Sequence, residues 1–414
     1  MRNILIIAND FPFPISGGNL RMFKLIKYLS RKNDLKIFLL INKCKDQKLL
    51  DLEFMRGVSI IFNNDVDFKK NSKNNITEIH SNRYKKLKNL FKRFLFIDRY
   101  LYTWVIPGLL KYYKLIKKNR IDFVITTSPT ISTHFFGLFF KLFFKKIFWI
   151  ADFRDLWFLS PEIQRSSKIT KYLYYHIEKL FLTNSDFNIF VSNSIKNITI
   201  NNFNIVDEKK HQVITNGFDP DDFIGIKKNY DKNKFFEIGY FGTIYDERQN
   251  NYLCESLLKY INQLKSEKIQ FLFYGEFNSD FKEKFKTLIE QEIVLFNKNL
   301  NHLDALSKMF EMDALLLILT NSLEGKIAFT GKFFEYLKIG KPILSLVPSD
   351  SEVSFFVKSH NIGISCMPDN IDDIFLSILK IKYSKFNFID EAILNNFSRE
   401  KTSELFYNIL INKS

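Results

Sequence analysis

The sequence predicts an α/β protein of two domains, each a doubly wound parallel sheet covered by helices. The chain has 414 residues, which is too long for one ordinary core. Short apolar runs typical of buried strands alternate with helical patterns along the whole chain. This alternation occurs twice, with a polar stretch between the two series, and such alternation is typical of parallel sheets.

The strand patterns define the expected domains. In the first half they lie at 3–8, 35–41, 58–62, 123–126, 147–151 and 188–191, and in the second at 238–241, 270–274, 314–319, 343–347 and 362–365. We expect an N-terminal domain at 1–205, a linker at 206–232 and a C-terminal domain at 233–397. A helical segment at 398–414 follows them.

Composition and charge narrow the class of protein. Hydrophobic residues make up 46% of the chain, and three widely separated cysteines fit neither a disulfide framework nor a metal site, which predicts a reducing cytoplasm. No stretch has the length of a signal peptide or a membrane span. The net charge is +16, and the window 69–120 alone holds fifteen Lys or Arg against two acidic residues. Such asymmetry indicates a polyanionic partner surface.

Two glycine-containing turns are candidate ligand sites. Gly17 and Gly18 stand between the first strand and a helical pattern, where glycines let a backbone approach a ligand. Near the other end, Thr330-Gly331-Lys332 opens a short helix, and Glu335 follows one turn later. A helix N-terminus with a lysine favours phosphate, and a carboxylate beside it can bind hydroxyls, as a nucleotide-sugar diphosphate requires. The alternative is an ordinary helix with a glycine at each end.

Several charged segments follow predicted strands. Arg154 and Asp155 come after the strand at 147–151, and either contacts a sugar or an acceptor hydroxyl or belongs to an internal Asp–Arg pair that fixes the loop. Asp219-Pro220-Asp221 follows an Asn-Gly turn signal, so we interpret it as a linker turn and predict no metal site. His134 lies on a strongly apolar helix and is expected to be packed and hydrogen-bonded.

A basic amphipathic helix is predicted at 84–95. Phe91 and Phe94 belong to its apolar stripe, and Lys85, Lys88 and Lys92 lie among or opposite them. Such a helix can bind an anionic membrane, pack on its own domain with a solvated lysine face, or bind nucleic acid. We favour the membrane and expect no nucleic-acid partner.

Six segments, in order, resemble the retaining glycosyltransferases of family 4, which have the GT-B fold. They are 9–21, 150–157, 190–194, 213–219, 239–249 and 330–344. The resemblance implies two Rossmann-like domains facing a central cleft, a final helix that returns to the N-terminal domain, and an acceptor-side or sugar-side role for the loop of Arg154 and Asp155. It also implies that Arg248 and Lys332 neutralise the leaving diphosphate, that Gly242 and Thr243 line the donor site, and that no metal is needed. The family's usual earlier glutamate is replaced by Ile327.

These observations predict a metal-independent, retaining hexosyltransferase that is cytoplasmic and peripheral on the inner face of the plasma membrane. Its donor is a nucleotide-diphosphate sugar, it needs no cofactor, and its acceptor is lipid-linked or a surface polysaccharide. The catalytic residues are expected to be Arg154, Asp155, Arg248 and Lys332. The alternatives are a sugar-nucleotide epimerase of the same fold and a catalytically degenerate binding or scaffold subunit.

Overall fold

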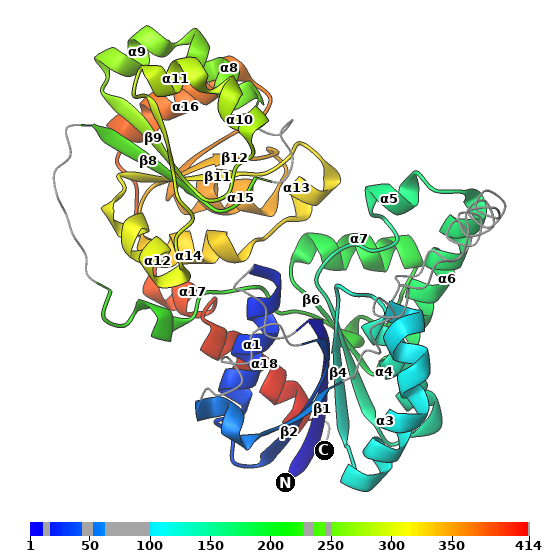
Figure 1. Cartoon of the computed structure of the whole chain (residues 1–414). Coiled ribbons are helices and arrows are strands. Elements are labelled where there is room, and N and C mark those ends of the chain that lie inside the picture. The colour runs from blue at the N-terminus through cyan, green and yellow to red at the C-terminus, as the bar shows by residue number, and fades with distance from the viewer. Residues whose placement is uncertain (11–16, 44–52, 63–99, 227–234, 245–250, 413–414) are drawn as a thin grey trace, which may run out of the picture. The chain divides into compact units, whose positions relative to one another are not determined.

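The protein is described from a computed structural model, which describes residues 1–10, 17–43, 53–62, 100–226, 235–244 and 251–412 (Figure 1). The chain forms two compact units. The first comprises Met1–Ile214 together with Ser403–Ser414, and the second comprises Thr215–Thr402. Each unit has its own parallel sheet and its own apolar core.

The first unit is built on a seven-stranded parallel sheet with the order β3-β2-β1-β4-β5-β6-β7. Strand β1, inside this sheet, is apolar on both faces, and Ile4 to Ile7 are fully buried, as expected for a strand covered by helices on both sides. Ile4 pairs with Ile37 on one side and with Phe123 on the other. The strands are β1 (Arg2–Asp10), β2 (Leu35–Lys43), β3 (Val58–Phe62), β4 (Phe123–Thr127), β5 (Phe148–Phe153), β6 (Phe187–Phe190) and β7 (His211–Val213).

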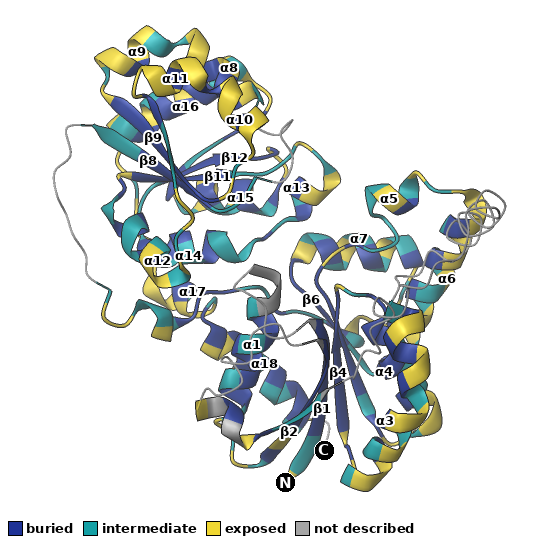
Figure 2. Ribbon diagram, in the orientation of Figure 1, coloured by how far each residue is buried: buried dark blue, intermediate teal, exposed yellow. Residues whose placement is uncertain are grey.

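Helices cover this sheet, and buried and exposed residues alternate along them (Figure 2). Leu25 and Ile26 of α1 pack with Phe406 and Leu410 of α18 against the β1–β2 side. Segment α18 belongs to the first unit from Ser403 onward. The helical segments are α1 (Gly17–Leu29), η2 (Glu53–Gly57), the π-helix η3 (Leu101–Val105), α3 (Ile106–Asn119), α4 (Thr133–Phe143), α5 (Pro161–Gln164), α6 (Lys168–Asn184), α7 (Asn193–Phe203), η4 (Glu208–Lys210) and α18 (Arg399–Ile411).

The second unit has a six-stranded parallel sheet with the order β10-β9-β8-β11-β12-β13. Its strands are β8 (Phe236–Phe241), β9 (Ile269–Tyr274), β10 (Val294–Asn297), β11 (Ala314–Ile318), β12 (Ile343–Leu346) and β13 (Gly363–Cys366). Its helices are η5 (Pro220–Phe223), α8 (Asn251–Lys259), α9 (Ile261–Ser266), α10 (Ser279–Lys284), α11 (Lys286–Glu290), α12 (His302–Glu311), α13 (Leu323–Ile327), α14 (Gly331–Ile339), α15 (Glu352–Ser359), α16 (Ile371–Tyr383) and α17 (Glu391–Asn395).

In both sheets the order of the strands reverses beside the first strand, which is the topological switch point of a doubly wound sheet. In the first unit the change lies between β1 and β4, and in the second it lies between β8 and β11. Open α/β sheets bind ligands outside the carboxyl ends of the strands at such a point. The predicted pair of doubly wound parallel sheets is therefore confirmed, and the order of the strands identifies the edge of each sheet where a site is expected.

Two strands were not predicted. Strand β7 has only three residues, and the side chains after its first are half-buried. Strand β10 likewise has one buried residue followed by three half-buried ones, so neither shows a clear apolar run. The segment Asp219-Pro220-Asp221 forms a turn, as predicted, because the Asp219 carboxylate accepts a hydrogen bond from the Asp221 N–H at the start of η5.

Candidate active site

The turn at Thr330 opens helix α14 in the second unit. Thr330 is extended and directly precedes Gly331, the first helical residue, and Gly340 ends the helix in the left-handed conformation. The Thr330 side chain does not cap the helix, and its buried hydroxyl oxygen has no hydrogen-bond partner within the described part of the chain. The N–H groups of the first turn thus meet no side-chain cap, which suits a bound anion.

Lys332 brings this helix start together with the end of strand β8. Its Nζ lies 4.4 Å from the centre of the Tyr240 ring, in a cation–π arrangement. A Cβ added to Gly242 would lie 2.6 Å from the same Nζ. Burial lowers the pKa of Lys332 to about 8, against the opposing effect of the Glu335 carboxylate. A desolvated ammonium gains most from a negatively charged ligand that replaces its lost water.

The loop after β8 needs glycine for two reasons. Gly242 has a φ of +129°, and the space above its Cα is taken by Lys332. The carbonyl of Gly242 also lies against Gly275, where an added Cβ would come within 2.2 Å of that oxygen. Gly275 was not predicted as a site residue, since it stands alone after its strand. Thr243 takes part through its backbone, whose carbonyl accepts a hydrogen bond from the Tyr240 hydroxyl at 3.4 Å.

Glu335 is joined to a histidine that was not predicted. His302, the first residue of α12, places Nε2 at 2.9 Å from Glu335 Oε1, while its Nδ1 lies 3.8 Å from an Asp222 carboxylate oxygen. All three side chains are partly exposed. No sequence spacing signals this cluster, because 33 residues separate His302 from Glu335. The imidazole fixes the position of the carboxylate that is predicted to bind donor hydroxyls.

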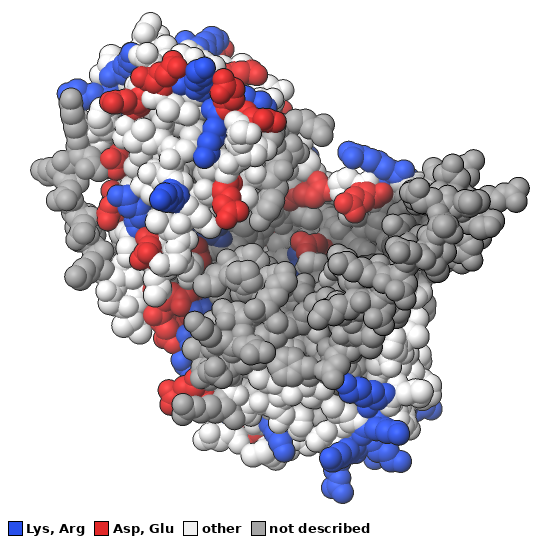
Figure 3. All heavy atoms as spheres, in the orientation of Figure 1, with Lys and Arg blue, Asp and Glu red and all other residues white. Residues whose placement is uncertain are grey.

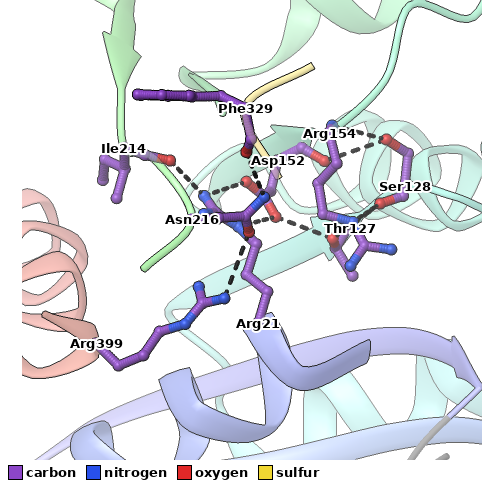
Figure 4. A network of polar contacts seen from close by, with 9 residues as sticks. All are labelled: Arg21, Thr127, Ser128, Asp152, Arg154, Ile214, Asn216, Phe329 and Arg399. Atoms are coloured by element: carbon purple, nitrogen blue, oxygen red, sulfur yellow. Dashed lines mark hydrogen bonds and ion pairs between the residues drawn. The ribbon is translucent and has the colours of Figure 1, made fainter. Parts of the chain in front are cut away.

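In the first unit, the loop after β5 contains a buried ion pair. Arg21 of α1 donates from Nη2 to Asp152 Oδ1 at 2.9 Å and from Nε to Oδ2 at 3.2 Å, and it also donates to the carbonyl of Ile214 (Figure 4). The Thr127 hydroxyl donates to the same carboxylate at 2.9 Å. This arrangement fixes the carboxyl ends of β4 and β5 relative to α1. Neither Arg21 nor Asp152 was predicted as a site residue.

The two predicted catalytic residues of this loop differ in their exposure to solvent. Arg154 is buried and donates from Nε to the carbonyl of Ser128 (Figure 4). Asp155 is exposed. The internal pair that fixes the loop thus joins Asp152 to Arg21, and the catalytic roles of Arg154 and Asp155 stay predictions.

His134 is packed, as predicted. It is fully buried on α4, and its Nδ1 lies 2.7 Å from the Thr126 hydroxyl, which in turn accepts a hydrogen bond from the Trp149 indole. Burial lowers the pKa of His134 to about 3. The histidine is therefore neutral and belongs to the core of the first unit.

Of the remaining predicted site residues, two lie in the described part of the chain and six do not. Gly17 and Gly18 are the first two residues of helix α1 rather than part of the loop before it, and their role in donor binding stays a prediction. Arg248 lies outside the described residues, as do the membrane-helix residues Lys85, Lys88, Lys92, Phe91 and Phe94. Among the helices that the structure describes, none combines the length and apolar character needed to cross a bilayer.

The chain resembles known proteins in part of its sequence and in its fold. A family model described as Glycosyltransferase Family 4 matches residues 77–222. A search of curated proteins finds no match. A glycosyltransferase structure from Rickettsia africae ESF-5 is 16% identical with a TM-score of 0.66, and the match covers 99% of this chain and 97% of that one.

Two further structures cover the chain almost completely. A lipopolysaccharide outer core galactosyltransferase in its apo form is 14% identical with a TM-score of 0.63, over 100% of both chains. A UDP-GlcNAc 2-epimerase from Neisseria meningitidis, bound to UDP-GlcNAc, is 14% identical with a TM-score of 0.59, over 99% of this chain and 100% of that one. The fold is therefore GT-B, and residues 77–222 of the chain are similar to glycosyltransferase family 4.

Proposed function

We propose that the protein transfers a sugar, with retention of configuration, from a nucleotide-diphosphate sugar to a lipid-linked or surface-polysaccharide acceptor. The observation that carries the proposal is the ammonium of Lys332, held at the start of α14 against Gly242, with the Glu335 carboxylate one turn further on. A structural neighbour with the same fold has UDP-GlcNAc bound, which supports a nucleotide sugar as the donor.

The proposed reaction requires stabilisation of the negative charge that develops on the leaving diphosphate. As the bond from the anomeric carbon to the diphosphate breaks, negative charge grows on the phosphate oxygens. Lys332 and the backbone N–H groups of the first turn of α14 stabilise that charge because they are in place before the reaction begins. Arg248 is proposed as a second cation. These cations would do the work that a divalent metal does in other transferases, so we propose that no metal is required.

Glu335 and the loop after β5 are proposed to act on the donor and on the acceptor, respectively. Glu335 would accept hydrogen bonds from hydroxyls of the donor, in an orientation set by His302. Arg154 and Asp155 would act on the acceptor side, and the Arg21–Asp152 pair would hold their loop in position. We propose a cytoplasmic enzyme, peripheral on the inner face of the plasma membrane, because the acceptor would be lipid-linked and the 69–120 window is strongly basic.

Release of nucleoside diphosphate tests the proposal. Purified protein is first screened for thermal stabilisation by a panel of nucleotide sugars, since a ligand stabilises the folded state that binds it. The best donor is then incubated with and without membrane lipid. We expect release that rises with lipid, persists in excess EDTA and is lost in Lys332→Ala. A protein that no nucleotide sugar stabilises, or whose activity EDTA abolishes and Mg²⁺ restores, would contradict the donor site or the metal independence, respectively.

An epimerase is the second candidate, because a UDP-GlcNAc 2-epimerase shares the fold over the whole chain. An epimerase would convert the donor into its epimer without any acceptor. The product distinguishes the two activities: NMR of the sugar nucleotide after incubation with an epimerase would show a new epimer, whereas a transferase releases nucleoside diphosphate and forms no epimer. A degenerate binding subunit would do neither.

A further inference from the structure

The first unit exposes large apolar side chains on one group of helices. Leu110 is 79% exposed, Tyr172 65% and Phe143 61%, and they lie on α3, α6 and α4, respectively. Tyr102, Ile106 and Leu142, on η3, α3 and α4, are also exposed. We call the surface formed by these six side chains the α3–α4–α6 face. Monomeric proteins rarely expose apolar side chains in such a group without a partner.

The three helices form one layer. The Tyr113 ring of α3 packs on Phe144, which follows α4, with ring centres 4.8 Å apart, and it also meets the edge of Phe143. Phe135 of α4 contacts Phe181 of α6 at 4.9 Å. The three helices therefore form one layer of the first unit, and Figure 2 shows exposed positions along them.

The charged side chains on the surface of these three helices are all basic. Helices α3, α4 and α6, each described in full, contain a single acidic residue, Glu178, and it is buried. Their basic residues are Lys111, Lys114, Lys117, Lys118, Lys141, Lys168, Lys171 and Lys179. Figure 3 shows Lys and Arg gathered at the lower right of the first unit, with no acidic group among them in that view.

We propose that the α3–α4–α6 face binds the surface of an anionic lipid bilayer. Exposed aromatic and aliphatic side chains can enter the interfacial region, while the surrounding lysines neutralise anionic headgroups. The proposal deepens the proposed function by naming the surface that reaches a lipid-linked acceptor, and it rests on described residues outside the predicted helix at 84–95.

The direction of the helices shows how this face lies relative to the acceptor-side loop. Helices α4 and α6 follow β4 and β5 in right-handed crossovers, so their first residues lie at the carboxyl ends of the strands. Arg154 and Asp155 lie at the same edge, directly after β5. Tyr172, near the start of α6, therefore lies toward this edge, whereas Leu142 and Phe143 end α4 and lie toward the opposite edge, so a bilayer on this face would run along the side of the unit.

Vesicle co-sedimentation of the full chain tests the proposal. We expect binding to vesicles containing phosphatidylglycerol, weak binding to pure phosphatidylcholine, and release as salt rises because surface charge is screened within about 8 Å at physiological ionic strength. The triple variant Lys114→Glu, Lys117→Glu and Lys118→Glu should lower partitioning by on the order of 100-fold. The pair Leu110→Ser and Phe143→Ser should weaken binding at every salt concentration.

Matched controls lie in the second unit. Lys282→Glu, Lys358→Glu and Lys385→Glu make the same charge change at exposed positions, and Ile224→Ser with Phe355→Ser removes exposed apolar side chains of comparable exposure. Both controls should bind vesicles like the wild type. Circular dichroism and thermal melting of each variant establish that its fold is intact.

The outcomes separate this proposal from the proposed function. Equal binding to neutral and anionic vesicles, or wild-type binding by both face variants, would overturn the docking surface. So would loss of self-association in the face variants without loss of vesicle binding, which would make the face an interface between copies. Donor hydrolysis should be unchanged in the face variants. If vesicles bind as expected but no nucleotide sugar is turned over, only the transferase proposal fails.

Discussion

The Asn216 side-chain amide donates a hydrogen bond to the carbonyl oxygen of Phe329, at 3.3 Å, and Phe329 directly precedes the Thr330 turn (Figure 4). Arg399 donates in turn from Nη2 to the side-chain oxygen Oδ1 of Asn216, at 3.5 Å. Asn216 follows the first boundary between the units by two residues, and Arg399 precedes the second by four. Both segments that lead into the second unit are thus tied to the start of its candidate donor site.

Removing this hydrogen bond should loosen the Thr330 turn. In Asn216→Ala we expect the donor KM to rise by up to about 10-fold, since one hydrogen bond contributes about 1 kcal/mol, with the fold retained. Asn387→Ala is the matched control, because Asn387 also donates to a backbone carbonyl of the second unit, that of His360. Equal donor KM values in the two variants would show that Asn216 does not position the turn.

Lys332→Ala should remove a contact that strengthens as the leaving group departs. We expect turnover to fall by about 10²–10³, the effect of deleting one preorganised donor at a developing charge. Lys338→Ala is the control on the same helix, because Lys338 packs over the Phe218 ring, with no contact to Lys332 among the described interactions. The kcat of both variants is compared with that of the wild type, and undiminished turnover in a folded Lys332→Ala protein would refute the assignment.

Gly242→Ala should displace the Lys332 ammonium as well as strain the loop. The added methyl would lie 2.6 Å from Nζ, so we expect donor affinity and turnover both to fall. Gly225→Ala separates the two effects, since Gly225 also has a positive φ (+77°) but open space above its Cα. A thermal melt measures strain in each variant, and a donor titration measures the site. The site interpretation fails if the two variants bind donor equally well.

Glu335→Gln preserves shape and one acceptor oxygen but loses the negative charge. We expect the donor KM to rise while kcat at saturating donor changes less, as for a group that binds donor hydroxyls equally in the ground and transition states. Glu311→Gln serves as the control, because Glu311 pairs with Lys308 at the end of α12. A near-total loss of kcat with unchanged KM would instead assign Glu335 a role in the chemical step.

Glu178 should make the stability of the first unit depend on pH. Burial raises the pKa of Glu178 to about 8, while its carboxylate accepts the Phe158 N–H at 2.7 Å. The unfolded chain releases this proton near its ordinary value of about 4.5. The stabilisation is therefore complete below pH 4.5 and is lost as the pH rises through 8. Glu178→Gln should abolish this component, which urea unfolding of both proteins between pH 5 and 9 would detect.

Local sequence patterns were sufficient to predict most of the strands and helices and the types of residue that form the candidate site. The apolar runs of β1, β4 and β9 and the Thr330-Gly331-Lys332 turn are visible in the chain itself. The residues that they contact in the folded protein cannot be recognised from the sequence in this way. Arg21 pairs with Asp152 across 131 positions, and Lys332 meets Gly242 only because α14 follows a strand next to β8. Such pairings depend on the order of the strands, which periodicity does not encode.

The division of the chain into units has a consequence for biosynthesis. The core of the first unit includes Phe406, Ile409 and Leu410, although residues 215–402 form a separate unit. A ribosome that has made the first 214 residues has therefore not yet made everything that this core contains. The second unit is continuous, so it is the one that can close first as the chain emerges. The N-terminal half must wait for the final helix, and a truncation near residue 405 would leave the first-made unit incomplete.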